Sequence, residues 1–226
     1  MLSGESGPHG TVYRASAGGP LLVLVGGPGF EPHWLGSALA STLGGIAVVL
    51  PEPEPEPESE AEIPAEVAVH AAAVRSAQVR ATIASASSLG ADPARVGVIG
   101  IGHGCTAALD TLALAEPHTA AAVRRLVLLT PTVAPQTDLG IIPPTFLQSA
   151  PQSATLAASR SLEIDLREAG VAVRPVEYIG LPDAWVRYPR FTPGSKRALE
   201  DIVTFLRRGF GLAGTFSGEI PGWDLR

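Results

Sequence analysis

Cysteine is almost absent from this chain of 226 residues, and so is lysine. Because Cys105 is the one cysteine, the chain forms no intramolecular disulfide and no cysteine metal cluster. All but one of the 16 basic residues are arginine, and alanine, glycine and proline are abundant. This bias indicates GC-rich codon usage and hence a bacterial source. No other metal-ligand spacing occurs, so we expect neither a metal nor another cofactor.

Long apolar runs and clusters of positive charge are also missing. No apolar segment approaches the ~18 residues of a membrane-spanning helix, and residues 1–5 lack the charged and apolar regions of a signal peptide. We therefore expect a cytoplasmic protein without membrane contact. The net charge is −6, and residues 52–66 carry a large share of the acidic side chains, which leaves the remaining surface close to neutral. Such a surface does not favour a nucleic-acid partner.

Short apolar segments alternate with segments of helical periodicity along the chain. We expect buried strands at residues 21–25, 46–50, 96–101, 126–130, 143–148 and 171–178, an edge strand at 11–14, and helices at 34–43, 64–89, 106–115, 159–169 and 195–208. Nearly all-apolar strands separated by helices predict an α/β fold with a mostly parallel, doubly wound sheet that is covered on both faces. The length suits a single domain over residues 1–226, with its core at about 11–208.

The sequence allows a more specific prediction for three segments, which are the loop at 51–64, the long helix at 64–89 and the tail at 209–226. Proline and glutamate alternate over residues 51–58, which predicts an extended, solvated loop over 51–64. The alternative for this loop is a ligand for a proline-reading domain. In the long helix, Val67, Val74, Val79 and Ile83 are expected to form much of the apolar side. Residues 209–226 show no periodicity, and we expect an irregular tail there.

Glycine occupies every second position where the strand at 96–101 meets the following helix. Gly100, Gly102 and Gly104 fit a sharp strand-to-helix turn, because larger side chains would collide with the neighbouring backbone. The same corner with the pattern G-x-S-x-G is the nucleophile elbow, in which a strained turn presents a serine. Gly102 stands in the place of that serine, so this corner presents no nucleophile.

Four segments in the same order then resemble one family. Residues 25–30 resemble the H-G-G-x-G oxyanion loop, and residues 92–100 resemble the segment that leads into the elbow. Residues 143–147 are similar to the strand before the catalytic acid, and 166–173 to the passage before the catalytic histidine. From about residue 20 to 208, the chain thus resembles the α/β-hydrolase superfamily, within it the bacterial esterase, acetylhydrolase and hormone-sensitive-lipase-like branch. The resemblance implies the α/β-hydrolase fold with a minimal cap domain or none.

The family's catalytic positions hold other residues in this chain. The resemblance places Gly102 at the nucleophile, Ser153 at the acid and Asp183 at the base, and Val25 replaces the histidine of the oxyanion loop. Acyl-enzyme chemistry needs a hydroxyl or thiol beside an oriented base. We therefore do not expect a serine hydrolase. Cys105 is expected to be a buried small side chain, and the alternative is a reactive thiol activated by the helix N-terminus.

The backbone N–H donors of the family's oxyanion hole need no particular side chains, so they can remain when the triad residues are replaced. The candidate catalytic residues are His103 and Asp183; their alternatives are a side chain that only fills or caps the elbow and an ordinary exposed aspartate, respectively. The candidate substrate-binding residues are Gly26, Gly27, Gly102, Trp34, Ser153 and Trp185. The two tryptophans are expected either as pocket walls or as core aromatics.

Two classes of function fit these residues. In the first, the protein binds a small organic molecule and catalyses a non-hydrolytic step, such as cyclisation, elimination or isomerisation, in bacterial specialised metabolism. It predicts an apolar pocket above Gly102, lined by His103 and Trp185. In the second, the protein is a pseudo-hydrolase that binds a ligand, a partner protein or a second copy of itself. It predicts a filled pocket or an exposed apolar patch.

Overall fold

The computed structural model describes residues 1–27, 32–51, 65–114, 116–132, 139–181, 185–187 and 193–212, with the side chains of 65–72, 117, 187 and 193 left out. Eight strands form one sheet in the order β1-β2-β4-β3-β5-β6-β7-β8. They are β1 (Gly4–Gly7), β2 (Gly10–Arg14), β3 (Pro20–Val25), β4 (Ile46–Val49), β5 (Asp92–Ile101), β6 (Val123–Leu129), β7 (Thr145–Ser149) and β8 (Val173–Glu177).

The sheet is mostly parallel, as the sequence predicts. Strands β3 to β8 pair in parallel, whereas β2 runs antiparallel to both β1 and β4. The carboxyl ends of the parallel strands therefore meet at one edge of the sheet. Turns that follow these strands can converge on a ligand there.

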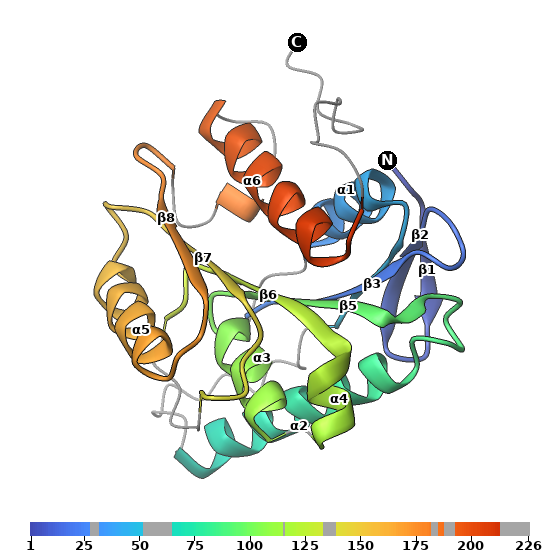
Figure 1. Ribbon diagram of the computed structural model, residues 1–226, viewed down its shortest axis with the longest axis horizontal. Coiled ribbons are helices and arrows are strands. Elements are labelled where there is room, and N and C mark those ends of the chain that lie inside the picture. Colours follow the sequence, from blue (N-terminus) through green and yellow to red (C-terminus); the bar gives the residue numbers. More distant parts are fainter. Residues whose placement is uncertain are drawn as a thin grey trace.

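Helices cover both faces of the sheet (Figure 1). On one face lie α1 (His33–Leu43) and α6 (Pro193–Gly209), and on the other lie α2 (Ala65–Ala84), α3 (Gly104–Ala113), α4 (Pro117–Ala122) and α5 (Leu156–Glu168). Each face has its own apolar core. The first contains Leu39 and Ile202 from the helices, and the second contains Ile83, Leu109 and Leu162.

The prediction of an edge strand at residues 11–14 is wrong. This segment is β2, which pairs with β1 on one side and β4 on the other, so β1 forms the edge. The sequence hides β1 because it reads Gly-Glu-Ser-Gly and has no apolar side chain. Its pairing comes from the hairpin with β2, where Gly7 lies opposite Gly10.

The long helix differs from the prediction in two respects. It ends at Ala84 and not at residue 89, because the serines that follow bond back to the chain: Ser88 Oγ donates to the Ser85 carbonyl at 2.8 Å. Val79 and Ile83 are buried as predicted, but Val74 is 44% exposed. Val74 is therefore not on the buried side of α2. The next two residues, Arg75 and Ser76, are buried. The side chain of Val67 is outside the described residues.

The sequence prediction also omitted α4. Its six residues begin with Pro117 in the first turn, where a proline costs no hydrogen bond because that amide has no helical partner. The other helices occur where the sequence places them, with ends shifted by a few residues. Among the described residues, no helix combines the length and apolar character needed to cross a membrane.

A polar cluster fixes α6 to the end of β8. Tyr178 donates its hydroxyl to Asp201 Oδ2 at 2.5 Å, and Arg174 donates to Asp201 Oδ1 at 3.0 Å. Burial of the ring, together with the hydrogen bond to Asp201, raises the pKa of Tyr178 well above its ordinary value. The phenol is therefore held in its protonated form in the folded protein.

We expect Tyr178→Phe to lower the free energy of unfolding by about 1–3 kcal/mol near neutral pH, because it removes a hydrogen bond to a charged group. The folded state holds the phenol proton more tightly than the unfolded chain does. This contribution is therefore complete below about pH 10, the ordinary tyrosine pKa, and is lost as the pH rises above it. Urea denaturation at about pH 8 and about pH 11 measures both effects. A difference between the variant and the unaltered protein that is equal at both pH values would contradict this expectation.

Candidate functional site

The turn from β5 into α3 requires two of its three glycines for steric reasons. A Cβ on Gly100 would lie 2.6 Å from the Cα of Cys105, and a Cβ on Gly104 would lie 2.1 Å from the carbonyl oxygen of Val25. Both distances are shorter than real Cβ contacts allow. Residues 100 and 104 therefore have to be glycine for α3 to start against the ends of β3 and β5.

The central glycine has no such steric reason. A Cβ on Gly102 would meet no heavy atom of the described residues within 4 Å, and the residue has a φ of +57°. A side chain at this position would thus project into open space from the tip of the turn. The turn therefore has a glycine at its tip that no contact within the described residues requires.

The loop after β3 lies directly against the elbow. A Cβ on Gly27 would lie 3.3 Å from the Cβ and 3.4 Å from the backbone nitrogen of His103. Neither the amide of Gly27 nor that of His103 donates to a backbone carbonyl of the described residues. The structure therefore brings the predicted residues Gly26 and Gly27 against His103, beside the turn at Gly102.

Arg75 contacts this loop from α2. Its side chain is buried, with 9% of the residue exposed, and its Nη1 donates to the carbonyl of Gly26. No sequence pattern marks this residue, because it lies in a helix with no motif and 49 positions from its partner.

His103 is exposed at the start of α3, and one of its ring nitrogens is engaged. Nδ1 lies 3.1 Å from Oγ1 of Thr132, a residue just after β6. The chain reaches Thr132 through Thr130, the one residue other than glycine with positive φ (50°) in the described part. For a β-branched residue this conformation costs on the order of 1–3 kcal/mol. Neither threonine was among the residues singled out from the sequence.

Cys105 is inert as a nucleophile. The residue has 0% exposure, and burial raises the pKa of its thiol far above the ordinary value. Its sulfur lies 3.6 Å from the carbonyl oxygen of Leu129. The interpretation as a small buried side chain is confirmed, and the thiolate needed for attack is disfavoured.

Trp34 and Trp185 pack against each other on the face covered by α1 and α6. Their ring centroids are 6.1 Å apart in an edge-to-face arrangement, and the indole nitrogen of Trp34 donates to the carbonyl of Val186. Trp185 is 1% exposed within the core of that face. Trp185 is thus a core aromatic, and Trp34 is partly buried and packs against the same core. Contact of either side chain with a substrate stays a prediction.

The hydroxyl of Ser153 forms hydrogen bonds within its own turn. It lies 2.6 Å from Oγ1 of Thr155 and accepts the amide of Thr155 at 2.9 Å, which shapes the turn before α5. Ser149 ends β7 and is 6% exposed. Asp183, the other predicted catalytic residue, lies outside the described residues. In the part of the chain that the structure covers, no group of three His, Cys, Asp or Glu residues is placed to hold a metal.

Solved structures with the same arrangement of strands and helices are esterases. A thermophilic, thermostable carboxylesterase cloned from a metagenomic library superposes with a TM-score of 0.71 at 19% identity, over 88% of this chain and 84% of that one. A thermostable esterase from Pseudomonas putida gives 0.70 at 17% identity, over 93% and 83%. A bacterial heroin esterase gives 0.68 at 18% identity, over 93% and 84%.

This likeness shows that the chain has the α/β-hydrolase fold, with β5 as the central strand that leads into the elbow. No protein-family model matches the sequence, and no curated protein matches it.

The contrast between Gly104 and Gly102 can be measured by substitution. We expect Gly104→Ala to lower the free energy of unfolding by more than about 3 kcal/mol, because its methyl group would overlap a carbonyl oxygen of β3. Gly102→Ala meets open space and should cost only about 1–2 kcal/mol, owing to its positive φ. Urea denaturation measures the free energy of unfolding of both variants. Equal losses in the two variants would contradict the assignment of the elbow.

Proposed function

We propose that the edge of the sheet at Gly27, Gly102 and His103 binds a small carbonyl compound and catalyses a non-hydrolytic reaction on it. The observation that carries this proposal is the pairing of an empty nucleophile position with intact backbone donors. A Cβ at Gly102 would meet none of the described residues within 4 Å, while the Cβ position of Gly27 lies 3.4 Å from the backbone nitrogen of His103. Such donors stabilise an oxyanion whether or not it is covalently attached to the protein.

The reaction that fits these groups begins with proton removal next to the carbonyl. Nε2 of His103 takes the proton from the α-carbon, the electron pair of the C–H bond forms a C=C bond to the carbonyl carbon, and the π pair of the carbonyl moves onto its oxygen. The resulting enolate accepts hydrogen bonds from the two amides. Return of the proton at another carbon gives isomerisation, and loss of a leaving group from the β-carbon gives elimination. Attack of the enolate carbon on an electrophile of the same molecule gives cyclisation.

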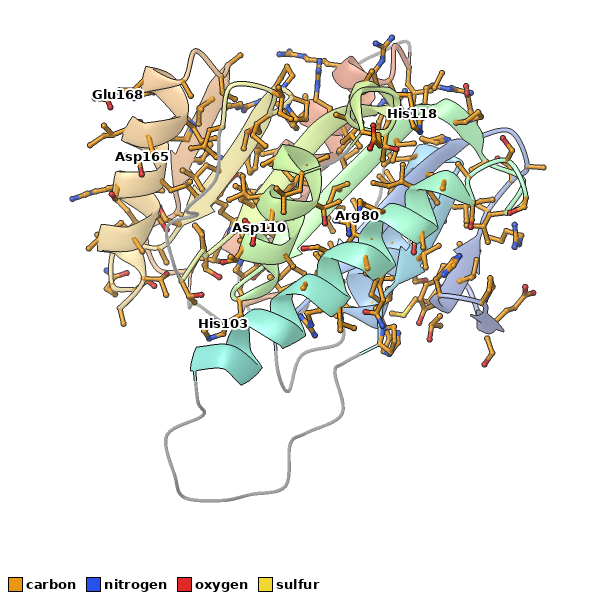
Figure 2. All side chains as sticks on the ribbon, turned by 90° about the horizontal axis from the view of Figure 1, so that it is seen from below. Arg80, His103, Asp110, His118, Asp165 and Glu168 are labelled. Atoms are coloured by element: carbon orange, nitrogen blue, oxygen red, sulfur yellow. The ribbon has the colours of Figure 1, made fainter. Side chains whose placement is uncertain are left out.

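The contact of His103 with Thr132 supports this role. When Nδ1 donates its proton to Oγ1 of Thr132, Nε2 carries a lone pair that can accept a proton. An imidazole exchanges protons readily near neutral pH, which suits a general base. Figure 2 shows His103 at the end of the molecule where α2 begins, while His118 lies at the opposite end.

Acyl transfer is disfavoured by the state of the nearby hydroxyl and thiol groups. Cys105 and Ser149 are buried, and Ser153 is bonded to Thr155. None of them combines exposure with a base among the described residues. The competing proposal, a pseudo-hydrolase that only binds a ligand or a partner, keeps the same donors but requires no proton transfer.

Hydrogen–deuterium exchange on simple ketones tests the proposed step. In heavy water, we expect the protein to accelerate exchange of the α-protons of acetophenone or cyclohexanone over buffer, as followed by proton NMR. His103→Ala should slow this reaction by about 100-fold or more, the usual contribution of a general base. His118→Ala removes another exposed histidine and should leave the rate unchanged. Binding of the ketones without exchange would favour the pseudo-hydrolase and overturn the proposal.

Hydrolysis of p-nitrophenyl butyrate tests the absence of acyl transfer. We expect p-nitrophenol release at the buffer rate, with no initial burst and no labelling of the protein by a fluorophosphonate, because neither a serine nor an accessible thiol stands at the elbow. Turnover that disappears in Cys105→Ala would show that the buried thiol is reactive after all. Labelling that persists in this variant would point to a serine nucleophile elsewhere, contrary to the assignment.

A further inference from the structure

We propose that Arg75 is a positioning residue that orients and strengthens the backbone donor of Gly27. The proposal rests on the proposed function for its catalytic consequence, but its physical basis is separate. A guanidinium group is costly to bury without partners, and Arg75 is 9% exposed. It directs Nη1 to the carbonyl of Gly26, in the loop that faces the elbow.

The helix that carries Arg75 is fixed beside α3. Oγ of Ser76 donates to the carbonyl of Ala107 at 3.4 Å. Oγ1 of Thr111 lies 3.3 Å from the carbonyl oxygen of Ser76 and makes its shorter hydrogen bond, at 2.7 Å, to the carbonyl of Ala107. Both contacts of Ser76 join the residue next to Arg75 to the helix that starts at the elbow. The guanidinium group therefore holds the loop at a set position relative to α3.

The orientation of the donor follows from peptide geometry. In a trans peptide the carbonyl oxygen and the amide hydrogen point in opposite directions. The Gly26 carbonyl is directed to Arg75, and its oxygen lies 2.9 Å from the Cβ position of Gly104. The amide hydrogen of Gly27 must therefore point away from Arg75 and from the first residue of α3. Gly27 itself lies against the amide of His103.

The charge adds an electronic effect to this orientation. A hydrogen bond from a cation is stronger than one between neutral groups. It draws electron density towards the carbonyl oxygen of Gly26, and the amide of the same peptide becomes a stronger donor, as in any chain of polarised hydrogen bonds. Arg75 thus acts on a bound oxyanion through one peptide group, without contact with the substrate.

Three substitutions separate this effect from a general loss of stability. Arg75→Met removes the charge and the donor, Arg75→Lys keeps the charge, and Arg80→Met removes another arginine of the same helix (Figure 2). In the ligand-free protein, we expect the amide proton resonance of Gly27 to move upfield in Arg75→Met and to move much less in Arg75→Lys. It should stay in place in Arg80→Met.

The rate of α-proton exchange on acetophenone supplies the second readout. We expect Arg75→Met to lower the maximal rate about tenfold with little change in KM, less than the loss of a whole oxyanion donor would cost. Arg75→Lys should restore most of this rate. If Arg75→Met does not fold, Arg75→Gln makes the same comparison with a neutral side chain.

If the amide proton resonance of Gly27 stays in place in a folded Arg75→Met or Arg75→Gln variant, the proposal is wrong. Because the resonance is measured without substrate, it remains informative even if the unaltered protein shows no exchange activity. In that case the proposed function fails, and the action of Arg75 on the loop is decided by the resonance alone. A shift of equal size in Arg80→Met would also overturn it.

Discussion

The contact on which the site depends is the close approach of the first turn of α3 to the end of β3. Gly104 lies so near the carbonyl of Val25 that no side chain fits between them. This approach lets the helix begin directly at the sheet, brings the amide of His103 beside Gly27, and turns Gly102 outwards. Because backbone packs on backbone here, the close approach at Gly104 involves no side chain at position 102. A site of this kind can lose its nucleophile and keep its shape.

The chemistry that such a site supports is set by its fixed dipoles. Amides that are held in place by the fold stabilise negative charge without the reorganisation that water would need. In acyl transfer, such donors stabilise the oxyanion of a tetrahedral intermediate. An enolate places the same charge on the same kind of oxygen. The proposed reaction therefore keeps the electrostatic part of the fold's chemistry and replaces the covalent part by proton transfer through His103.

Local sequence patterns predicted most of the fold, because each apolar strand and each amphipathic helix is encoded by neighbouring residues. The elbow was predicted for the same reason, since alternating glycines occur within a few positions. Strand β1 was missed because its pairing, and not its composition, makes it a strand. Arg75 and Thr132 were missed because their partners lie 49 and 29 positions away. Such contacts depend on the assembled tertiary structure, and no residue spacing in the sequence indicates them.

The open space at the tip of the elbow has an evolutionary consequence. Some glycine codons become serine codons by a single base change, and a serine at position 102 would meet no neighbouring side chain of the described residues. Introducing a hydroxyl at this position is thus a short mutational step, whose cost comes from the positive φ and not from repacking of the described residues. Acyl transfer would need an oriented base and an acid besides this hydroxyl, and both would come from other loops. The tip of the turn is thus a place where one substitution adds a functional group without repacking the described residues.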